Sequence, residues 1–260
     1  MLKQTDWEVP QYSLLEFKPK KTKYCICIPV INEGEKFRKQ LMTMSKYASF
    51  VDIIILDKGS TDGSTDANFL KKNKVTSLLV LKEKGRQGAQ LRMGFAYALT
   101  QGYEGVITID GNGKDGIDAI PNFIRALDEG FDYIQGSRFV KGGVWVNTPL
   151  LRAIGIRFIH APLLSLAAHY WYTDTTNGFR AYSKKYLLHP KVKPFRKIFD
   201  RYELIFYLTA RANQLGLKTE EIPVSRIYPK GEIPTKITGL KGNMDLLFTV
   251  LKIIANAYNP

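Results

Sequence analysis

Apolar residues in the first half of the chain alternate between strand-like runs and helix-like spacing. The runs that predict buried strands are residues 23–31, 51–57, 76–82, 105–110 and 131–136. Segments with helical spacing or capping residues lie between them, at 33–48, 60–73, 86–102 and 118–130. This β-α-β-α order predicts an α/β fold, in which a single Rossmann-like and mostly parallel sheet carries helices on both faces.

The regular alternation ends after residue 140. The stretch 150–172 is apolar and aromatic, and its interior Pro162 is expected to break or kink a helix there. The other elements predicted in this half are a turn-rich stretch at 174–183, a helix at 199–216, a strand and its exit at 218–229, and an amphipathic tail helix at 242–260. Because the sequence has no internal repeat and no clear linker, we predict one domain over residues 1–260.

The chain is strongly basic. Its 260 residues include 38 Lys and Arg against 24 Asp and Glu, a net charge of +14. Such a surface attracts anions, so nucleic acid, an anionic membrane face and a phosphorylated substrate are the partner classes to consider. Nucleic acid is disfavoured, because the sequence has no RNP-like or zinc-binding motif and its acidic residues gather where phosphates would bind.

The cysteines, the N-terminus and the apolar runs indicate the kind of compartment in which the protein works. Cys25 and Cys27 are the only cysteines, and they alternate within a strand-like run. That spacing suits two small buried side chains in a reducing compartment. The polar N-terminus is not typical of a signal peptide, and no apolar run approaches the ~20 residues of a spanning helix. We therefore expect a soluble or peripherally bound protein.

Polar side chains follow three of the predicted strands. Asn32, Asp57 and Asp110 each fall where a strand ends. Because ligands of mostly parallel sheets bind beyond the carboxyl ends of the strands, we expect these three residues to share one crevice.

Six short motifs follow one another along the chain. They are PVINE (29–33), LDKGSTDGS (56–64), an Asp-x-Asn step (110–112), GSRF (136–139), DTTNGFRAY (174–182) and EIPV (221–224). In this order and spacing they resemble the family-2 glycosyltransferases of the GT-A fold, and most of all the polyprenyl-phosphate branch typified by dolichyl-phosphate mannose synthase. The resemblance implies a nucleotide-sugar-binding half at about 23–140 and an acceptor-side half at about 141–236, before the tail helix at 242–260.

The resemblance also implies roles for single residues. Those expected to bind the nucleotide-sugar donor are Pro29, Asn32, Glu33, Asp57, Lys58, Ser60, Lys84, Arg86, Asp110, Asn112, Lys114, Lys230 and Lys236. Asp110 and Asn112 match the D-x-D pair that holds a divalent metal, Mg or Mn, against the donor diphosphate. The acceptor side is expected to contain Arg138, Arg152, Arg157, His160, Asn177 and Arg180. The residues expected to be catalytic are Asp110, Asp174 and Arg180.

Two positions depart from the family pattern. Asn112 offers a carbonyl oxygen but no charge, so the metal site is expected to be weak or dispensable. Lys114 either adds positive charge near the diphosphate or points to solvent from a Gly-rich turn. Lys58 stands where the family usually has an aspartate that reads the donor base. A donor-only side chain suits cytosine, unless Lys58 turns away and backbone groups read the base.

The sequence leaves two kinds of acceptor open, and both are compatible with inverting transfer. A sugar hydroxyl, as in cell-surface polysaccharide synthesis, would need Asp174 as general base. A lipid phosphate is already an anion and would need cations to hold it, with Asp174 orienting arginines or touching the metal. The net charge favours a polyprenyl phosphate, with peripheral contact to an anionic membrane on its cytoplasmic face. A non-catalytic nucleotide-sugar binder is the further alternative.

Overall fold

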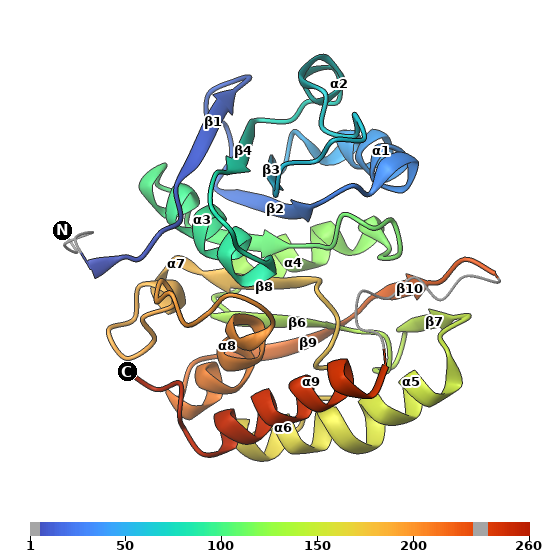
Figure 1. Cartoon of the computed structure of the whole chain (residues 1–260), viewed down its shortest axis with the longest axis vertical. Coiled ribbons are helices and arrows are strands. Elements are labelled where there is room, and N and C mark those ends of the chain that lie inside the picture. The colour runs from blue at the N-terminus through green and yellow to red at the C-terminus, as the bar shows by residue number, and fades with distance from the viewer. Residues whose placement is uncertain (1–5, 231–238) are drawn as a thin grey trace. The chain divides into compact units, whose positions relative to one another are not determined.

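The computed structural model describes residues 6–230 and 239–260 and divides into two compact units (Figure 1). Unit 1 contains residues 1–113 and 187–204, and unit 2 contains residues 114–186 and 205–260. A border therefore falls at residue 113 rather than near residue 140. The single-domain organisation stays a prediction.

Unit 1 contains five strands in the order β1-β4-β3-β2-β5. They are β1 (Tyr12–Glu16), β2 (Tyr24–Val30), β3 (Asp52–Asp57), β4 (Ser77–Leu81) and β5 (Gly105–Thr108). All pair in parallel except β1, which runs antiparallel to β4. The sequence analysis missed β1, because this edge strand leaves Leu14 and Leu15 exposed and has no alternating pattern of burial.

The helices of unit 1 follow the predicted alternation. They are α1 (Gly34–Met44), the short η2 (Ser45–Tyr47), α2 (Ala67–Lys72) and α3 (Gln87–Thr100). Helix α3 packs on β2, β3 and β4. Gly94 permits this close approach, since a Cβ there would lie 2.6 Å from Leu56 Cδ1. The predicted α/β fold with mostly parallel strands is therefore confirmed.

Unit 2 is built around β6 (Tyr133–Ser137), which pairs antiparallel with β8 (Arg180–Ser183) and parallel with β9 (Thr219–Pro223). Helix α4 (Ile120–Asp128), entered through η3 (Ile117–Ala119), packs on these three strands. A second, two-stranded sheet pairs β7 (Val144–Val146) with β10 (Ser225–Ile227). The remaining helices outside the 150–168 stretch are α7 (Lys184–Leu187), α8 (Glu203–Gln214) and α9 (Gly239–Ile254).

The apolar stretch after residue 150 forms one continuous helical segment, in α5 (Leu150–Gly155), the π-helix η4 (Ile156–His160) and α6 (Ala161–Ala168). Pro162 does not end it. The Ala161 N–H donates to the Ile156 carbonyl with π-helical spacing, and Pro162 then sits in the first turn of α6, where its missing N–H costs little.

Length and composition would therefore allow the helix Leu150–Ala168 to cross a membrane. The expectation that no apolar run is long enough for this is wrong, because the π-turn joins two runs that Pro162 was expected to separate. Only 33% of the segment is buried. The tail helix α9 runs beside α6 (Figure 1).

Candidate functional site

Two loops in unit 1 are bound to each other at the carboxyl ends of β2 and β3. Asp57 is buried and accepts hydrogen bonds from the Ser60 N–H (2.9 Å) and hydroxyl (2.7 Å). Asn32, in a left-handed conformation (φ 48°), accepts from the Thr61 N–H at 2.8 Å, and its own N–H donates to Ser60 Oγ at 3.0 Å. Asp57 thus fixes the loop that follows β3, and Asn32 binds that loop to the one that follows β2.

The other residues expected in these loops lie around the same point. Pro29 is in β2, half-buried and paired in register with Leu56. Glu33 precedes α1, whose first N–H, that of Gly34, donates to Asp62 Oδ2 at 2.8 Å. Asp62 was not predicted, although the GSTDGS motif contains it.

Two buried glutamines bind backbone groups at the ends of the strands, and the sequence analysis singled out neither of them. Gln90 donates from α3 to the carbonyls of Val30 (3.0 Å) and Leu56 (2.6 Å). Gln40 donates to the Asp110 carbonyl at 3.0 Å and accepts from the Gly113 N–H at 2.8 Å. Their amides fix the spacing of strand ends that would otherwise present unsatisfied carbonyls.

Asp110 and Asn112 are adjacent, as a metal pair requires. Gln87 Nε2 lies 3.4 Å from Asp110 Oδ1, and Asn112 Nδ2 lies 3.3 Å from Asp110 Oδ2. Within residues 6–230 and 239–260, no three His, Cys, Asp or Glu side chains gather as a metal site. One carboxylate and one amide therefore fit a Mg or Mn ion whose remaining ligands come from substrate phosphates. They do not fit an ion that the protein holds by itself.

A hollow of about 550 Å³ in unit 1 brings together three predicted donor-binding residues, Lys58, Lys84 and Arg86. Its wall also contains Asp200, which accepts from the Arg86 N–H at 3.1 Å and whose carbonyl accepts from the Gly88 N–H at 2.9 Å. The predicted helix at 199–216 therefore starts late, at Glu203, because residues 199–201 pack on the start of α3. The Lys58 side chain is exposed.

Lys114, in unit 2, does not point to solvent. It is only 7% exposed, and its ammonium lies 5.1 Å from the centroid of the Tyr228 ring. Neighbouring Asp115 forms an ion pair with Arg226, with both carboxylate oxygens 2.7 Å from Nη1. The reading of Lys114 as a solvated turn residue is wrong, because β10 covers this turn.

Asp174 and Arg138 form a buried ion pair in unit 2. Arg138 Nε donates to Asp174 Oδ2 at 2.6 Å and Nη2 to Oδ1 at 3.2 Å, with side chains 1% and 0% exposed. Burial alone would raise the pKa of the Asp174 carboxyl, but the charge and hydrogen bonds of Arg138 outweigh it, so that pKa is lowered. Arg138 Nη1 is buried and has no hydrogen-bond partner within the described chain.

Arg180 is a fully buried residue whose guanidinium is used within the fold. It donates to the carbonyls of Asn177 (2.8 Å), Ile205 (2.6 Å) and Thr175 (2.8 Å) and to Thr209 Oγ1 at 3.0 Å. These hydrogen bonds fix the DTTNGFR loop. The catalytic and acceptor-binding roles of Arg180 stay predictions.

Two other predicted acceptor residues lie in the same interior. His160 contacts Thr175 Oγ1 through Nδ1 at 2.6 Å, and burial followed by the charge of Arg180 lowers its pKa to about 4. His160 is therefore neutral near pH 7, and the expectation that it supplies positive charge is wrong. Asn177 is buried and accepts from the Phe179 N–H at 2.9 Å. His160 Nε2 and Asn177 Nδ2 are buried without a partner within the described residues.

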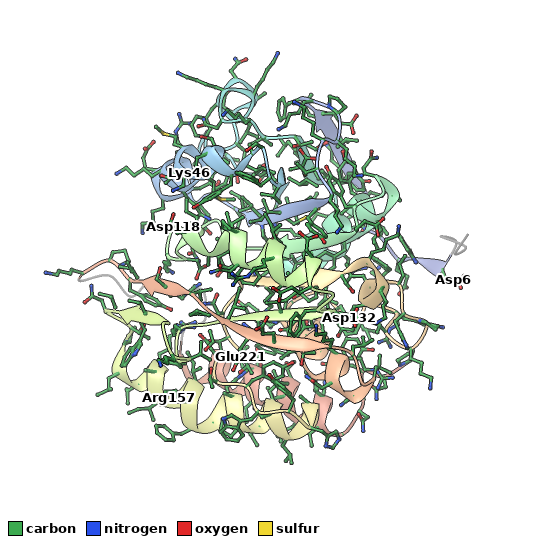
Figure 2. The ribbon with its side chains drawn as sticks, turned by 180° about the vertical axis from the view of Figure 1, so that it is seen from behind. Asp6, Lys46, Asp118, Asp132, Arg157 and Glu221 are labelled. Carbon is green, nitrogen blue, oxygen red and sulfur yellow. The ribbon has the colours of Figure 1, made fainter. Side chains whose placement is uncertain are left out.

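The remaining predicted residues are nearer the surface. Arg157 is exposed (Figure 2). Its guanidinium carbon lies 5.3 Å from the centroid of the Phe139 ring. Arg152 is half-buried on α5, and Lys230 is exposed. Lys236 lies outside the described residues.

Glu221 is a site residue that the sequence analysis did not single out. It lies on β9 (Figure 2) and accepts from the N–H groups of Thr173 (2.9 Å) and Asp174 (3.2 Å). Burial raises its pKa from 4.5 to about 7 in spite of these hydrogen bonds. Its place in the EIPV motif was the available signal.

A mostly parallel α/β fold, with two linked loops at the strand ends and a buried Arg–Asp pair, is the arrangement of a glycosyltransferase of GT-A type. The sequence model described as "Glycosyl transferase family 2" matches residues 25–189, more than half of the chain. The chain belongs to this family. The prediction of family and fold is confirmed.

Several characterised proteins are similar to this chain. A polyprenol monophosphomannose synthase of Mycolicibacterium smegmatis is 27% identical over 206 residues, covering 77% of this chain and 76% of that protein. An undecaprenyl-phosphate mannosyltransferase of Micrococcus luteus is 27% identical over 202 residues (76% and 81%). A UDP-N-acetylglucosamine–dolichyl-phosphate N-acetylglucosaminyltransferase of Methanococcus voltae is 28% identical over 222 residues (78% and 85%).

Solved structures agree with the fold. Glucosyl-3-phosphoglycerate synthase from Mycobacterium tuberculosis, in complex with phosphoglyceric acid, superposes with a TM-score of 0.66 at 15% identity, covering 89% of this chain and 80% of that one. The same enzyme with Mn2+, uridine diphosphate and glucosyl-3-phosphoglycerate gives 0.62 at 14% identity, with the same coverage.

Proposed function

We propose that this protein is an inverting glycosyltransferase that moves a sugar from a nucleotide-sugar to a polyprenyl phosphate at the membrane surface. The observation that carries the proposal is the buried Arg138–Asp174 pair. Asp174 is bound in bidentate fashion and its pKa is lowered, so it is a weak proton acceptor. A sugar-hydroxyl acceptor would need a stronger base to take its proton, whereas a phosphate acceptor is already an anion and needs none.

The chemistry that follows is a single displacement. A phosphate oxygen of the acceptor forms a bond to the anomeric carbon, while the bond from that carbon to the nucleoside diphosphate breaks and the diphosphate leaves with the electron pair. Arg138, which Asp174 orients, keeps its buried Nη1 available to donate to the incoming phosphate. Asp110 and Asn112 would hold a divalent metal, which when bound neutralises charge on the leaving diphosphate.

The names of the related proteins support the proposed classes of substrate. Three relatives are described as transferases acting on polyprenol, undecaprenyl phosphate or dolichyl phosphate, and each covers about three quarters of this chain. For the donor, the GSTDGS loop and the hollow containing Lys58 support nucleotide binding. Because Lys58 only donates hydrogen bonds, a cytidine donor belongs in the panel beside uridine and guanosine donors.

Contact with a membrane is supported by exposed apolar side chains of unit 2. Leu151 is 84% and Phe158 71% exposed on the Leu150–Ala168 helix. On α9 the exposed residues Met244, Leu247, Phe248 and Leu251 follow the spacing of one helical face. An exposed apolar stripe on two neighbouring helices of a basic protein suits a peripheral position among anionic headgroups, and we place the protein on the cytoplasmic face.

The experiment that tests the proposal is a transfer assay with radiolabelled UDP-, GDP- and CDP-sugars and farnesyl phosphate. Sugar transfer to farnesyl phosphate, lost in Asp110→Ala, would support it. Transfer to a glycan hydroxyl but not to farnesyl phosphate would replace it with the polysaccharide alternative. Binding of a nucleotide without transfer or hydrolysis, for every donor, would favour a non-catalytic binder.

A further inference from the structure

A second hollow of unit 1, with a volume of about 620 Å³, contains none of the residues predicted to bind donor or acceptor. Within the described part of the chain, its wall includes four lysines and no acidic residue. The lysines are Lys18, Lys21, Lys71 and Lys74, and Phe17 is among the uncharged residues beside them. We call these five residues the lysine hollow. A concave surface that gathers four like charges attracts an anion.

The lysine hollow lies at the amino end of β3, and the loop that Asp57 fixes follows the carboxyl end of the same strand. Asp52 is the first residue of β3, and its Oδ2 accepts from the N–H groups of Lys21 (2.8 Å) and Thr22 (3.0 Å). Because an extended strand rises ~3.3 Å per residue, the stretch from Asp52 to Asp57 spans about 17 Å. A ligand in the lysine hollow therefore lies at the other end of β3 from that loop.

Hydrogen bonds join the two segments that carry the lysines. The Thr76 carbonyl accepts from the Phe17 N–H at 2.9 Å, and the Thr76 hydroxyl donates to Asp52 Oδ1 at 3.1 Å. Phe17 comes directly before Lys18 in the sequence, and Thr76 comes two residues after Lys74. The segment before β2 and the segment after α2 are therefore held against each other through Thr76.

Helix α2 carries Lys71 and Lys74 on a fixed turn. The helix ends in a Schellman motif, in which the Val75 N–H donates to the Leu70 carbonyl and the Lys74 N–H to the Lys71 carbonyl, both at 3.1 Å. These bonds occupy carbonyls that would otherwise repel an anion at the end of the helix. Lys74 takes the left-handed position of the motif (φ 61°), where glycine is usual. The backbone under both lysines is therefore set before any ligand binds.

One carboxylate balances only part of the charge of the lysine hollow. The Lys18 ammonium lies 3.9 Å from Asp52 Oδ1, and within residues 6–230 and 239–260 this is the one ion pair that any of the four lysines forms. Burial lowers the pKa of Lys18, the Asp52 charge raises it, and the charges of Lys21 and Lys74 lower it further, so the net change is downward. The lysines therefore repel one another, and an anion among them would relieve that repulsion.

We propose that the lysine hollow binds an anion with two or more phosphoryl groups, held by the ammonium groups of Lys18, Lys21, Lys71 and Lys74. One phosphoryl group carries about two negative charges at neutral pH, too few to balance four ammonium groups beside one carboxylate. The volume is that of pockets for small ligands, which measure about 300–1,000 Å³. The phosphoryl groups belong to a soluble compound or to a lipid headgroup. Because the lysine hollow shares no residue with the predicted donor and acceptor sites, it is independent of the proposed function.

The test is calorimetric titration of the full chain with sodium tripolyphosphate and with inorganic phosphate, in EDTA. Tripolyphosphate should bind at least about 10-fold more tightly than inorganic phosphate, because it reaches more of the lysines. Lys71→Met/Lys74→Gly removes two ammonium groups from exposed side chains and should weaken tripolyphosphate binding about 10- to 100-fold. Glycine suits the left-handed position of Lys74, so this double variant should melt no lower than the wild type.

Two controls separate the lysine hollow from other basic surfaces. Lys72→Met removes an exposed ammonium from the same end of α2 but outside the hollow, and should keep the affinity for tripolyphosphate within about 2-fold of wild type. Lys84→Met removes a charge from the other hollow of unit 1 and should also keep that affinity within about 2-fold.

Sedimentation with phosphatidylcholine vesicles that contain phosphatidylinositol phosphate identifies the source of the phosphoryl groups. Vesicle binding that is lost in the double variant and kept in Lys72→Met assigns a lipid headgroup to the lysine hollow. Vesicle binding that the double variant shares with the wild type assigns a soluble compound.

A folded double variant that binds tripolyphosphate as tightly as the wild type would overturn the proposal, and so would a wild type that does not bind it. An equal loss in Lys72→Met would also overturn it, because that loss would indicate unspecific attraction to a basic surface. A loss in Lys84→Met would place the anion in the other hollow. None of these results depends on sugar transfer, so failure of the transfer assay would leave the lysine hollow standing.

Discussion

The role of Asp174 can be tested through the ion pair it forms. Asp174→Asn removes the negative charge but keeps the size of the side chain, and it leaves the Arg138 guanidinium buried at 1% exposure without its partner. Breaking a buried ion pair from one side costs about 3–5 kcal/mol of unfolding free energy. For a chain of 260 residues this corresponds to a fall in Tm of roughly 5–15 °C.

The double variant Arg138→Met/Asp174→Asn removes both charges and should be more stable than Asp174→Asn alone, since it buries no unpaired charge. Lys185→Met is the control, because Lys185 is 69% exposed in its 2.9 Å pair with Asp132 and should contribute no more than about 1 kcal/mol. Urea unfolding of the wild type, Asp174→Asn, Arg138→Met and the double variant measures the cycle, and Lys185→Met is unfolded beside them.

Kinetics separate positioning from base catalysis. If Asp174 orients Arg138, Asp174→Asn should mainly raise the KM for farnesyl phosphate. If Asp174 were a general base, kcat would fall about 100- to 10,000-fold while the acceptor still bound. An Asp174→Asn protein within about 1 kcal/mol of wild-type stability would refute the ion-pair reasoning, because it would mean that Arg138 does not need its partner.

Three further predictions concern pH, packing and the membrane. The pKa of Glu221 is about 7, above its usual 4.5, so the folded state binds this proton more tightly than the unfolded state does. The free energy of unfolding should therefore fall as pH rises from 4.5 to 7. Glu221→Gln should flatten this pH profile, which urea unfolding at several pH values measures. Gly88→Ala should cost about 1–3 kcal/mol, since its Cβ would lie 2.6 Å from the Phe199 carbonyl; a melting temperature equal to wild type would contradict this close approach. Replacing Leu151 and Phe158 together by Ser should release the protein from sedimented vesicles containing anionic lipid at unchanged nucleotide affinity, whereas undiminished vesicle binding would exclude this face.

The alternation of strands and helices could be predicted from the sequence because it is a local property. Buried runs such as 51–57 and helical spacing such as 86–102 are each encoded within a short stretch of neighbouring residues. The same local pattern predicted Asp57 and Asp110 at the ends of strands. In the structure Asp57 is the last residue of β3, and Asp110 follows the end of β5 by two residues. Edge strand β1 escaped this logic, because only pairing with β4, more than 60 residues away, makes it a strand.

The side-chain environments were decided by contacts between distant segments. Lys114 is buried because β10, more than 100 residues later, lies over its turn. His160 is neutral because Arg180 and the interior surround it, and Asp174 is a poor base because Arg138 binds both of its oxygens. Sequence by itself determined the residue types, their order and the elements that hold them. Burial and charge pairing, which set protonation and the direction of each polar group, were decided only by the tertiary structure, because they depend on which distant residues come together.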